Sequence, residues 1–106
     1  MRDRILALLG IAQKARAVAS GSFLTEQAVA KQTAKLVIIA SDASANTRDS
    51  LEKITYYYKV PVLVYGTKET LGHAIGQSER SCVALLDGGF ASKIRSQYAM
   101  ENQSEE

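Results

Sequence analysis

Hydrophobic and polar positions change their period along the chain, and these changes divide it into nine expected helices and strands. Apolar residues recur at helical spacing over residues 4–15, which predicts a first, amphipathic helix. Leu36 to Ala40 is a continuous apolar run rich in β-branched residues, which is typical of a strand buried on both faces. Shorter apolar runs predict further strands over residues 17–20, from Val60 onward with Pro61 at the entrance, and over residues 83–86.

Capping and stop residues predict the remaining helices. These helices are expected over about residues 21–33, 47–57, 67–75 and 91–100. Gly76 stops the fourth of the five helices. Helices and strands therefore alternate with short connections, so we expect an α/β fold in which helices sandwich a mainly parallel sheet. We expect one domain over residues 1–100 and a flexible polar tail over residues 101–106.

Three junctions between a strand and the next helix are rich in Gly, Ser, Asp and Thr. They lie at residues 17–22, 36–42 and 62–68. In an α/β layer such junctions gather at one edge of the sheet and leave helix N-termini facing solvent. This edge attracts anions such as phosphates. Since no catalytic motif accompanies it, the pattern favours binding of a phosphate-bearing partner over conversion of a substrate.

Composition and charge narrow the expected class of protein. The 106 residues are 46% hydrophobic with seven Gly and one Pro, which fits one folded domain. The lone Cys82 forms no internal disulfide, so we expect a reducing, cytoplasmic location. No apolar run approaches the roughly 20 residues of a membrane span, and no signal peptide or membrane association is expected. Residues 1–35 hold six basic and two acidic side chains, a net of +4 that favours a polyanionic partner.

Three stretches are informative in combination. Gly21 opens a helix, residues 34–42 read AKLVIIASD, and Val-Pro-Val at 60–62 is followed by YGTKxxLGxAIG at 65–76. Over roughly residues 4–94 this combination resembles the ribosomal protein L-seven-Ae family, and within it a bacterial YlxQ-like branch. The resemblance implies a three-layer α/β/α sandwich with a four-stranded mixed sheet. It also implies non-enzymatic binding of structured, kinked RNA helices (kink-turns) by a ribosome-associated monomer.

The resemblance further implies where RNA binds. The RNA surface of the family consists of the start of the second helix, the loop after the buried strand and the loop before the last strand. In this chain these segments are residues 21–31, 41–44 and 77–81. Archaeal and eukaryotic members carry Gly-x-Asn-Glu-x-x-Lys at the second helix. Here Gly21 is retained, whereas Phe23, Leu24 and Gln27 replace the Asn, Glu and Lys.

The second helix also supports a binding site on physical grounds. At about 100° per residue, Phe23, Gln27 and Lys31 share one stripe. A different side, expected to face the core, carries Leu24, Thr25, Ala28 and Val29. Phe23 can then stack on an unpaired base, Gln27 can bond a base edge, and Lys31 can contact a phosphate. The free N–H groups of Ser22 and Phe23 face the RNA backbone. The alternatives are that Phe23 packs under a neighbouring helix and that Gln27 is simply solvated.

Two loops complete the candidate site. Ser41 and Asp42 follow the buried strand, and Gln77 and Arg80 belong to the polar loop before the last strand. Recognition of RNA uses such loops to reach unpaired bases and 2′-hydroxyls. Arg80 can stack on a base or form a bidentate phosphate contact. The alternative is an ordinary surface loop.

Other residues are given structural roles. Asp42 and Asp87 each follow an apolar strand, where carboxylates can hold magnesium, but we expect both to cap the next helix. His73 has no partner at metal-ligand spacing, and we expect Cys82 to be a small buried group. Three tyrosines at a helix end, residues 56–58, suit stacking on bases, but we expect them to pack against the sheet and the following strand. No nucleotide-binding or hydrolase motif occurs, so no catalytic residue, cofactor or metal is expected.

Three classes of function remain open at this point. The first is a cytoplasmic RNA-binding protein. The second is a protein-interaction adaptor on the same fold, in which RNA reading is lost and Phe23 is exposed for a protein partner. The third is a small enzyme or phospho-receiver that uses Asp42 and Asp87. The third is the weakest, because a receiver needs clustered acids after its first strand and residues 17–20 supply none.

Overall fold

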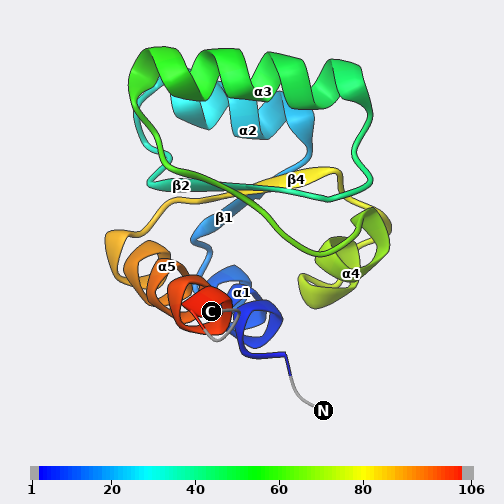
Figure 1. Cartoon of the computed structure of the whole chain (residues 1–106), viewed down its shortest axis with the longest axis vertical. Coiled ribbons are helices and arrows are strands. Elements are labelled where there is room, and N and C mark those ends of the chain that lie inside the picture. Colours follow the sequence, from blue (N-terminus) through cyan, green and yellow to red (C-terminus); the bar gives the residue numbers. More distant parts are fainter. Residues whose placement is uncertain (1–2, 104–106) are drawn as a thin grey trace.

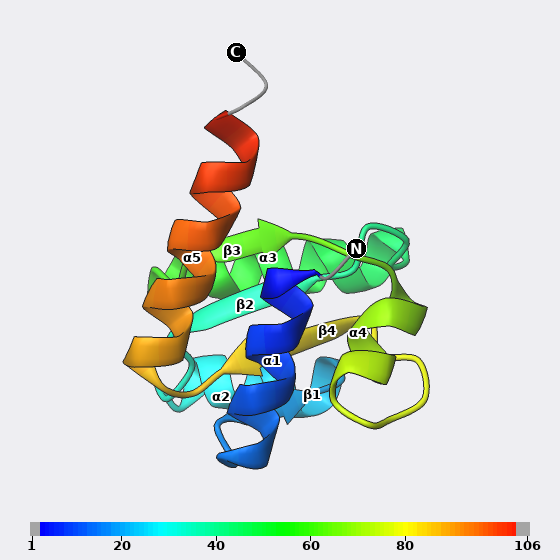
Figure 2. The same cartoon turned by 90° about the horizontal axis from the view of Figure 1, so that it is seen from below.

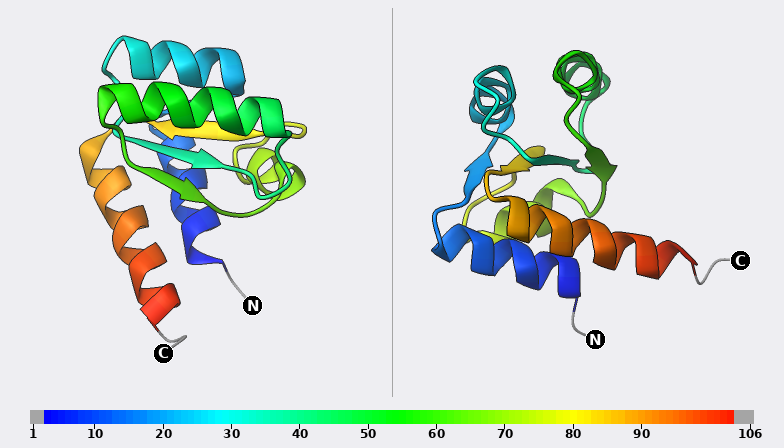
Figure 3. Two further views of the ribbon diagram at one scale, coloured as in Figure 1. Left: turned by 45° about the horizontal axis from the view of Figure 1, so that its top comes forward. Right: turned by 90° about the vertical axis from the view of Figure 1, so that its left-hand side faces the viewer.

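A four-stranded sheet separates two layers of helices in the computed structural model, which describes residues 3–103 (Figure 1). In chain order the elements are α1 (Arg4–Lys14), β1 (Val18–Ser20), α2 (Ser22–Ala30), β2 (Leu36–Ile39), α3 (Ala45–Tyr58), β3 (Val62–Val64), α4 (Lys68–Ala74), β4 (Cys82–Leu85) and α5 (Gly88–Gln103). Helices α1, α4 and α5 lie together below the sheet (Figure 2). Helices α2 and α3 lie side by side on its other face (Figure 3). The expected three-layer α/β/α sandwich is confirmed.

The sheet is mixed, with the spatial order β1-β4-β2-β3. Strand β4 is antiparallel to both of its neighbours, and β2 and β3 are parallel to each other. The mixed sheet that the family resemblance implied is therefore confirmed. The mainly parallel sheet expected from the alternation of elements is wrong, although β1, β2 and β3 do run in the same direction.

The path of the chain after α4 explains the reversed strand. Helix α4 has only seven residues, and the loop that follows it turns back before β4 (Figure 2). The backbone N–H of Arg80 donates to the carbonyl of Lys68 over 3.0 Å, so the loop returns to the start of α4. A parallel strand needs a crossover that carries the chain to the opposite end of the sheet. Because the chain returns instead to the end that it left, β4 runs antiparallel.

The two central strands are buried on both faces, as their continuous apolar runs predict. All eight residues of β2 and β4 are fully buried. Alternate side chains point to opposite faces. Leu36, Ile38, Val83 and Leu85 thus join the cluster below the sheet, together with Ile5 and Leu9 of α1. Val37, Ile39, Cys82 and Ala84 join the cluster under α2 and α3. Burial on both faces leaves only the ends of these strands available for function.

Two helices differ most clearly from the sequence predictions in their boundaries. Helix α5 begins at Gly88, because an Asp87 carboxylate oxygen accepts the N–H of Phe90 at 3.0 Å and so caps the helix there. It continues to Gln103, so residues 101–103 are helical; the remainder of the expected tail, residues 104–106, lies outside the described residues. Helix α2 ends at Ala30 because Gln32 adopts a left-handed φ of 63°. No helix among the described residues is long and apolar enough to cross a membrane.

A partly buried hydrogen bond joins the start of α1 to the end of β3. Asp3 caps α1 by accepting the N–H of Leu6 at 2.9 Å, and its second carboxylate oxygen accepts the Tyr65 hydroxyl at 2.6 Å. Burial of Tyr65, the hydrogen bond to Asp3 and the nearby carboxylates raise the pKa of the phenol above its ordinary value of 10.0. One carboxylate thus holds two elements that are 62 residues apart in the sequence.

We expect Tyr65→Phe to lower the free energy of unfolding at neutral pH by about 1 kcal/mol, because it removes a half-exposed hydrogen bond to a carboxylate. The raised pKa means that this stabilisation is complete below pH 10.0 and is lost as the pH rises above it, since the unfolded phenol ionises first. Urea unfolding over a pH series should show a shallower alkaline loss of stability in the variant than in the wild type.

Tyr98→Phe is the matched control for this substitution. The Tyr98 ring contacts the Tyr65 ring edge-on, with centroids 6.3 Å apart. Its hydroxyl has no hydrogen-bond partner within residues 3–103. Equal effects of the two substitutions would contradict a stabilising role for the bond to Asp3.

Candidate nucleic-acid interface

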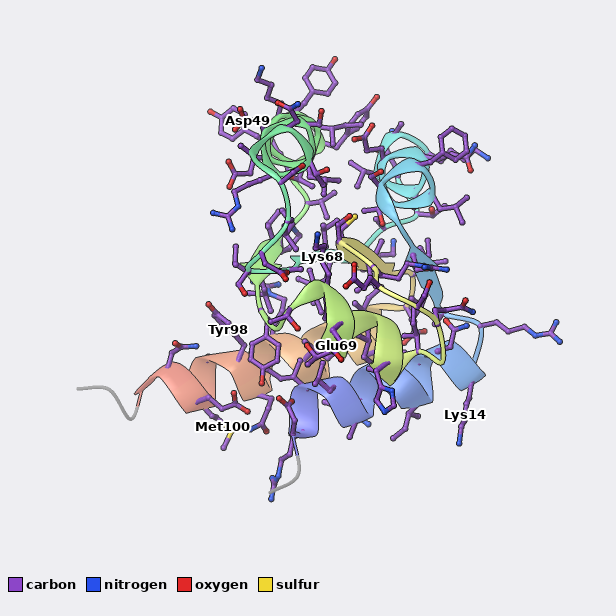
Figure 4. All side chains as sticks on the ribbon, turned by 90° about the vertical axis from the view of Figure 1, so that its right-hand side faces the viewer. Lys14, Asp49, Lys68, Glu69, Tyr98 and Met100 are labelled. Atoms are coloured by element: carbon purple, nitrogen blue, oxygen red, sulfur yellow. The ribbon has the colours of Figure 1, made fainter. Side chains whose placement is uncertain are left out.

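The ends of β1, β2 and β3 and the start of β4 meet at one edge of the sheet. Here Gly21 donates its N–H to Cys82 over 2.9 Å, Ala40 donates to Ser81 over 2.8 Å, and Ser41 donates to Gly66 over 2.8 Å. The three junctions predicted from the sequence therefore do gather at one edge. We call residues 20–23, 41–44, 66–68 and 77–81 the junction edge. Figure 4 looks onto it, with Lys68 near its centre.

The start of α2 is the part of the junction edge that presents free backbone donors. Gly21 precedes the helix with φ 88° and ψ 160°, a conformation almost confined to glycine. Glycine has no side chain to cap the helix, and no side chain within residues 3–103 accepts the first N–H groups of α2. The other helices are capped by side chains, namely Asp3, Ser44, Thr67 and Asp87. The first turn of α2 therefore suits an anionic group of a partner.

Phe23 and Gln27 line the outer face of α2 beside these donors. The Phe23 ring is 74% exposed, so the alternative that it packs under a neighbouring helix is wrong. Gln27 is also exposed, and Thr25, Ala28 and Val29 are buried as expected. Leu24 was expected to face the core but is 47% exposed. The entry of α2 thus carries two neighbouring apolar side chains in contact with water.

Lys31 lies on the same face of α2 but away from the junction edge. It is the C-cap of the helix, eight residues beyond Phe23 and about 12 Å further along the axis. Its side chain is exposed and has no hydrogen bond or ion pair with any described residue. A ligand must therefore extend along α2 to reach both Phe23 and Lys31.

The Arg80 side chain orders the loop at residues 77–81. Its Nε donates to Ser20 Oγ at 3.3 Å, which brings the loop beside the start of α2. Its Nη1 donates to Ser78 Oγ at 3.2 Å and to the Glu79 carbonyl at 2.9 Å, and its Nη2 donates to Gln77 Oε1 at 3.2 Å. Four of its five N–H donors are engaged. A bidentate phosphate contact therefore requires one of these bonds to break, whereas stacking on the guanidinium plane does not.

Gly72 lets this loop pack closely against α4. A Cβ atom at Gly72 would lie 1.8 Å from the Ser78 carbonyl oxygen and 3.1 Å from Glu79 Cα. The Gly72 carbonyl also accepts the N–H of Gln77 at 2.9 Å. The absence of a side chain at this position is therefore what allows the loop to lie where it does.

Ser41 and Asp42 join two parts of the junction edge. An Asp42 carboxylate oxygen accepts the N–H of Lys68 at 2.8 Å, so Asp42 links the loop after β2 to the start of α4. It does not cap α3 as expected, because Ser44 takes that role by accepting the N–H of Thr47 at 3.2 Å. Both side chains at 41 and 42 remain exposed.

The expected capping role of Asp87 is confirmed, and its position excludes a joint site with Asp42. Because β4 is antiparallel to β2, the two carboxylates follow strands that end at opposite edges of the sheet. No group of three or more potential metal-ligating side chains occurs within residues 3–103. Cys82 is buried as expected, and burial raises the pKa of its thiol.

Lys68 of the junction edge and Arg48 beside it were not among the predicted site residues. Lys68 opens α4 and lies between α3 and α4 (Figure 4). Arg48 of α3 donates from Nη2 to the Ser41 carbonyl at 3.2 Å. A sequence signal for Lys68 was present, since the Thr67-Lys68 pair belongs to the stretch at 65–76 that carries the family resemblance. No local signal points to Arg48, since its position depends on how the first turns of α3 pack over the loop.

The fold agrees with comparisons to known proteins. The match to the Ribosomal protein L7Ae/L30e/S12e/Gadd45 family extends over residues 3–95, and the chain belongs to this family. The RNA-binding protein YlxQ of Bacillus subtilis is 42% identical over 87 residues, which is 82% of this chain and 87% of that protein. The RNA-binding protein YlxQ of Enterococcus faecium is 31% identical over 94 residues, 89% and 90% of the two chains.

Solved structures share the same architecture. A Bacillus halodurans C protein of unknown function has a TM-score of 0.86 at 36% identity, with 90% of this chain and 96% of that chain covered. A 15.5kD RNA binding protein of Giardia lamblia has a TM-score of 0.79 at 22% identity, with 92% and 89% covered. The Giardia protein is similar in fold. The family expected from the sequence is confirmed.

We expect Gly72→Ala to displace the loop at 77–81 and to destabilise the protein by about 1–3 kcal/mol, as overpacking does. Thermal unfolding measures the stability. Hydrogen exchange at the amides of Gln77 and Arg80 measures the loop, because both donate to carbonyls of α4. Both amides should lose protection.

Gly88→Ala is the matched control, since a Cβ at Gly88 meets nothing within 4 Å and the residue lies at the opposite edge of the sheet. It should leave stability and loop protection unchanged or slightly improved. Wild-type protection in Gly72→Ala would show that the loop does not depend on this close approach.

Proposed function

We propose that this protein is a non-enzymatic RNA-binding protein that recognises structured, kinked RNA through the junction edge. The observation that carries the proposal is the uncapped start of α2, with exposed Phe23 and Gln27 beside it and the Arg80 loop next to it. The names of two relatives at 42% and 31% identity support RNA as the partner. We further propose that it acts as a cytoplasmic monomer on ribosomal or other ribosome-associated RNA.

Each part of the junction edge has a chemical role in this proposal. The free N–H groups at Ser22 and Phe23 hold a phosphate of the RNA backbone at the point where the RNA strand bends. The exposed Phe23 ring stacks on a base that the kink removes from the helix. Gln27 donates to and accepts from the edge of a base. Lys68 supplies positive charge to phosphates, and the plane of Arg80 offers a second stacking surface.

The residues that differ from the archaeal and eukaryotic pattern change how bases are read. Asn and Glu side chains read base edges through hydrogen bonds, whereas Phe23 and Leu24 offer only apolar surface. Stacking tolerates any base, since every base has a π-face. We therefore propose that the junction edge recognises the shape of a kinked RNA more than its sequence.

Calorimetric titration with a kink-turn RNA and a matched unkinked duplex, at two salt concentrations, tests the proposal. We expect tighter binding to the kinked RNA and a salt dependence that corresponds to about two to four phosphate contacts. Phe23→Ala should weaken binding about tenfold without changing the salt slope, because stacking releases no counterions. Lys31→Ala should lower the slope by about one.

Lys93→Ala on α5 is the charge-matched control, because α5 lies on the other face of the sheet and Lys93 is exposed. Its salt slope should equal that of the wild type. An unchanged slope in Lys31→Ala would remove Lys31 from the interface. Equal affinity for kinked and unkinked RNA, unaffected by Phe23→Ala, would contradict the proposal and favour a protein partner for the exposed Phe23.

A further inference from the structure

The far end of α3 carries exposed aromatic side chains that the fold does not use. The sequence predicted that residues 56–58 pack against the sheet, but Tyr56 is 87% exposed and Tyr57 is 76% exposed. Only Tyr58 packs against the core beneath α2 and α3. The Tyr57 and Tyr58 rings meet edge-on, with centroids 4.8 Å apart and an angle of 80° between their planes. The prediction is therefore wrong for two of the three tyrosines.

These tyrosines line a continuous groove. A hollow of about 640 Å³ is bordered by Lys53, Tyr56 and Tyr57, and a second of about 250 Å³ is bordered by Lys35 and Tyr58. The two hollows share Lys59 and Val60, so they form one surface. We call residues 32–35 and 53–61 the tyrosine groove.

The charge of the tyrosine groove is entirely positive. Its two segments read QTAK and KITYYYKVP, with three lysines and no acidic residue. The lysine side chains have no hydrogen bond or ion pair with any described residue. Asp49 and Glu52, on the preceding turns of α3, are the acids of this helix. Three lysines against these two acids leave an excess of one positive charge around the exposed rings.

The tyrosine groove lies at the opposite end of the helical layer from the junction edge. Helices α2 and α3 run alongside each other, and each begins at the junction edge after a strand of the same direction (Figure 3). Their last turns therefore lie together on the other side. At 1.5 Å per residue, the 14 residues of α3 separate its two ends by about 20 Å. The two surfaces are distinct and can be altered independently.

We propose that the tyrosine groove binds a segment of single-stranded RNA. Unpaired bases stack on the rings of Tyr56 and Tyr57, and the phosphates face the surrounding lysines. Adjacent aromatic rings in a basic groove match the repeating chemistry of a nucleic-acid strand, in which bases alternate with negative charges. All charged side chains that line the groove are basic, which favours this polyanion over a protein partner. The proposal goes beyond the function proposed for the junction edge and does not require it.

Titration with a single-stranded oligouridine of about ten nucleotides tests this proposal directly. We expect Tyr56→Ala/Tyr57→Ala to weaken binding at least about tenfold, and Tyr56→Phe/Tyr57→Phe to retain the affinity because the ring faces remain. The chain has five tyrosines and no tryptophan, so its intrinsic fluorescence reports on tyrosine. Oligouridine should quench this fluorescence in the wild type and quench it much less in the phenylalanine variant.

The lysines give a second, independent readout. Lys35→Ala/Lys59→Ala should lower the salt slope of oligouridine binding by about 1.4, at roughly 0.7 per phosphate contact of a single strand. Lys93→Ala/Arg95→Ala removes the same charge from α5 and should leave the slope unchanged. A similar loss in both double variants would show that only general electrostatic attraction is at work, and would overturn the proposal.

Phe23→Ala separates this surface from the junction edge. We expect it to weaken binding of kinked RNA and to leave oligouridine binding intact, whereas the Tyr56→Ala/Tyr57→Ala variant should show the reverse. The proposal is wrong if wild type and the alanine variant bind oligouridine equally, or if neither binds it. It is also wrong if Phe23→Ala alone abolishes oligouridine binding. Thermal unfolding should show that the variants keep the fold, since Tyr56 and Tyr57 are largely exposed.

Discussion

The insertion of β4 between β1 and β2 is the constraint on which the rest of the structure depends. The hydrogen bonds from Gly21 to Cys82 and from Ala40 to Ser81 join three separate segments at the start of this strand. They bring the loop before β4 between the start of α2 and the loop after β2. Because β4 is fully buried on both faces, a shift of its register would expose a row of apolar side chains. The core of the sandwich thereby determines the position of a surface that takes no part in the core.

The loop at residues 77–81 is held from two sides before any ligand arrives. Gly72 allows its backbone to approach α4, and the Arg80 side chain bonds to Ser20 and to three groups of the loop itself. A loop that is already ordered loses little conformational entropy on binding. This arrangement also limits what Arg80 can do, since its donors are mostly engaged. A rigid loop with an available guanidinium plane is better suited to stacking than to a new bidentate contact.

Local patterns predicted the elements well, whereas contacts between distant segments were harder to foresee. Continuous apolar runs identify β2 and β4, since burial on both faces requires such runs at any register. The direction of β4 depends on the loop that returns along α4, and the bond from Arg80 to Lys68 has no signature in either segment. In the candidate site, helical spacing predicted that Phe23 is exposed, and the structure agrees. The same reasoning missed Arg48, which reaches the edge through tertiary packing, and wrongly placed Tyr56 and Tyr57 against the sheet.

The junction edge and the tyrosine groove differ in what they are built from. At the junction edge the distinctive groups are backbone ones: the uncapped N–H groups of α2 and a loop whose path depends on a glycine. Such groups survive changes of side chain, so the recognition of RNA shape that we propose is compatible with Phe23, Leu24 and Gln27 in place of the Gly-x-Asn-Glu-x-x-Lys pattern. The tyrosine groove depends instead on side chains alone, two rings and three lysines. Substitutions therefore alter the binding properties of the tyrosine groove more easily than those of the junction edge. The layer of α2 and α3 thus carries two separate surfaces. The junction edge at one end is built from backbone groups, and the tyrosine groove at the other end is built from side chains.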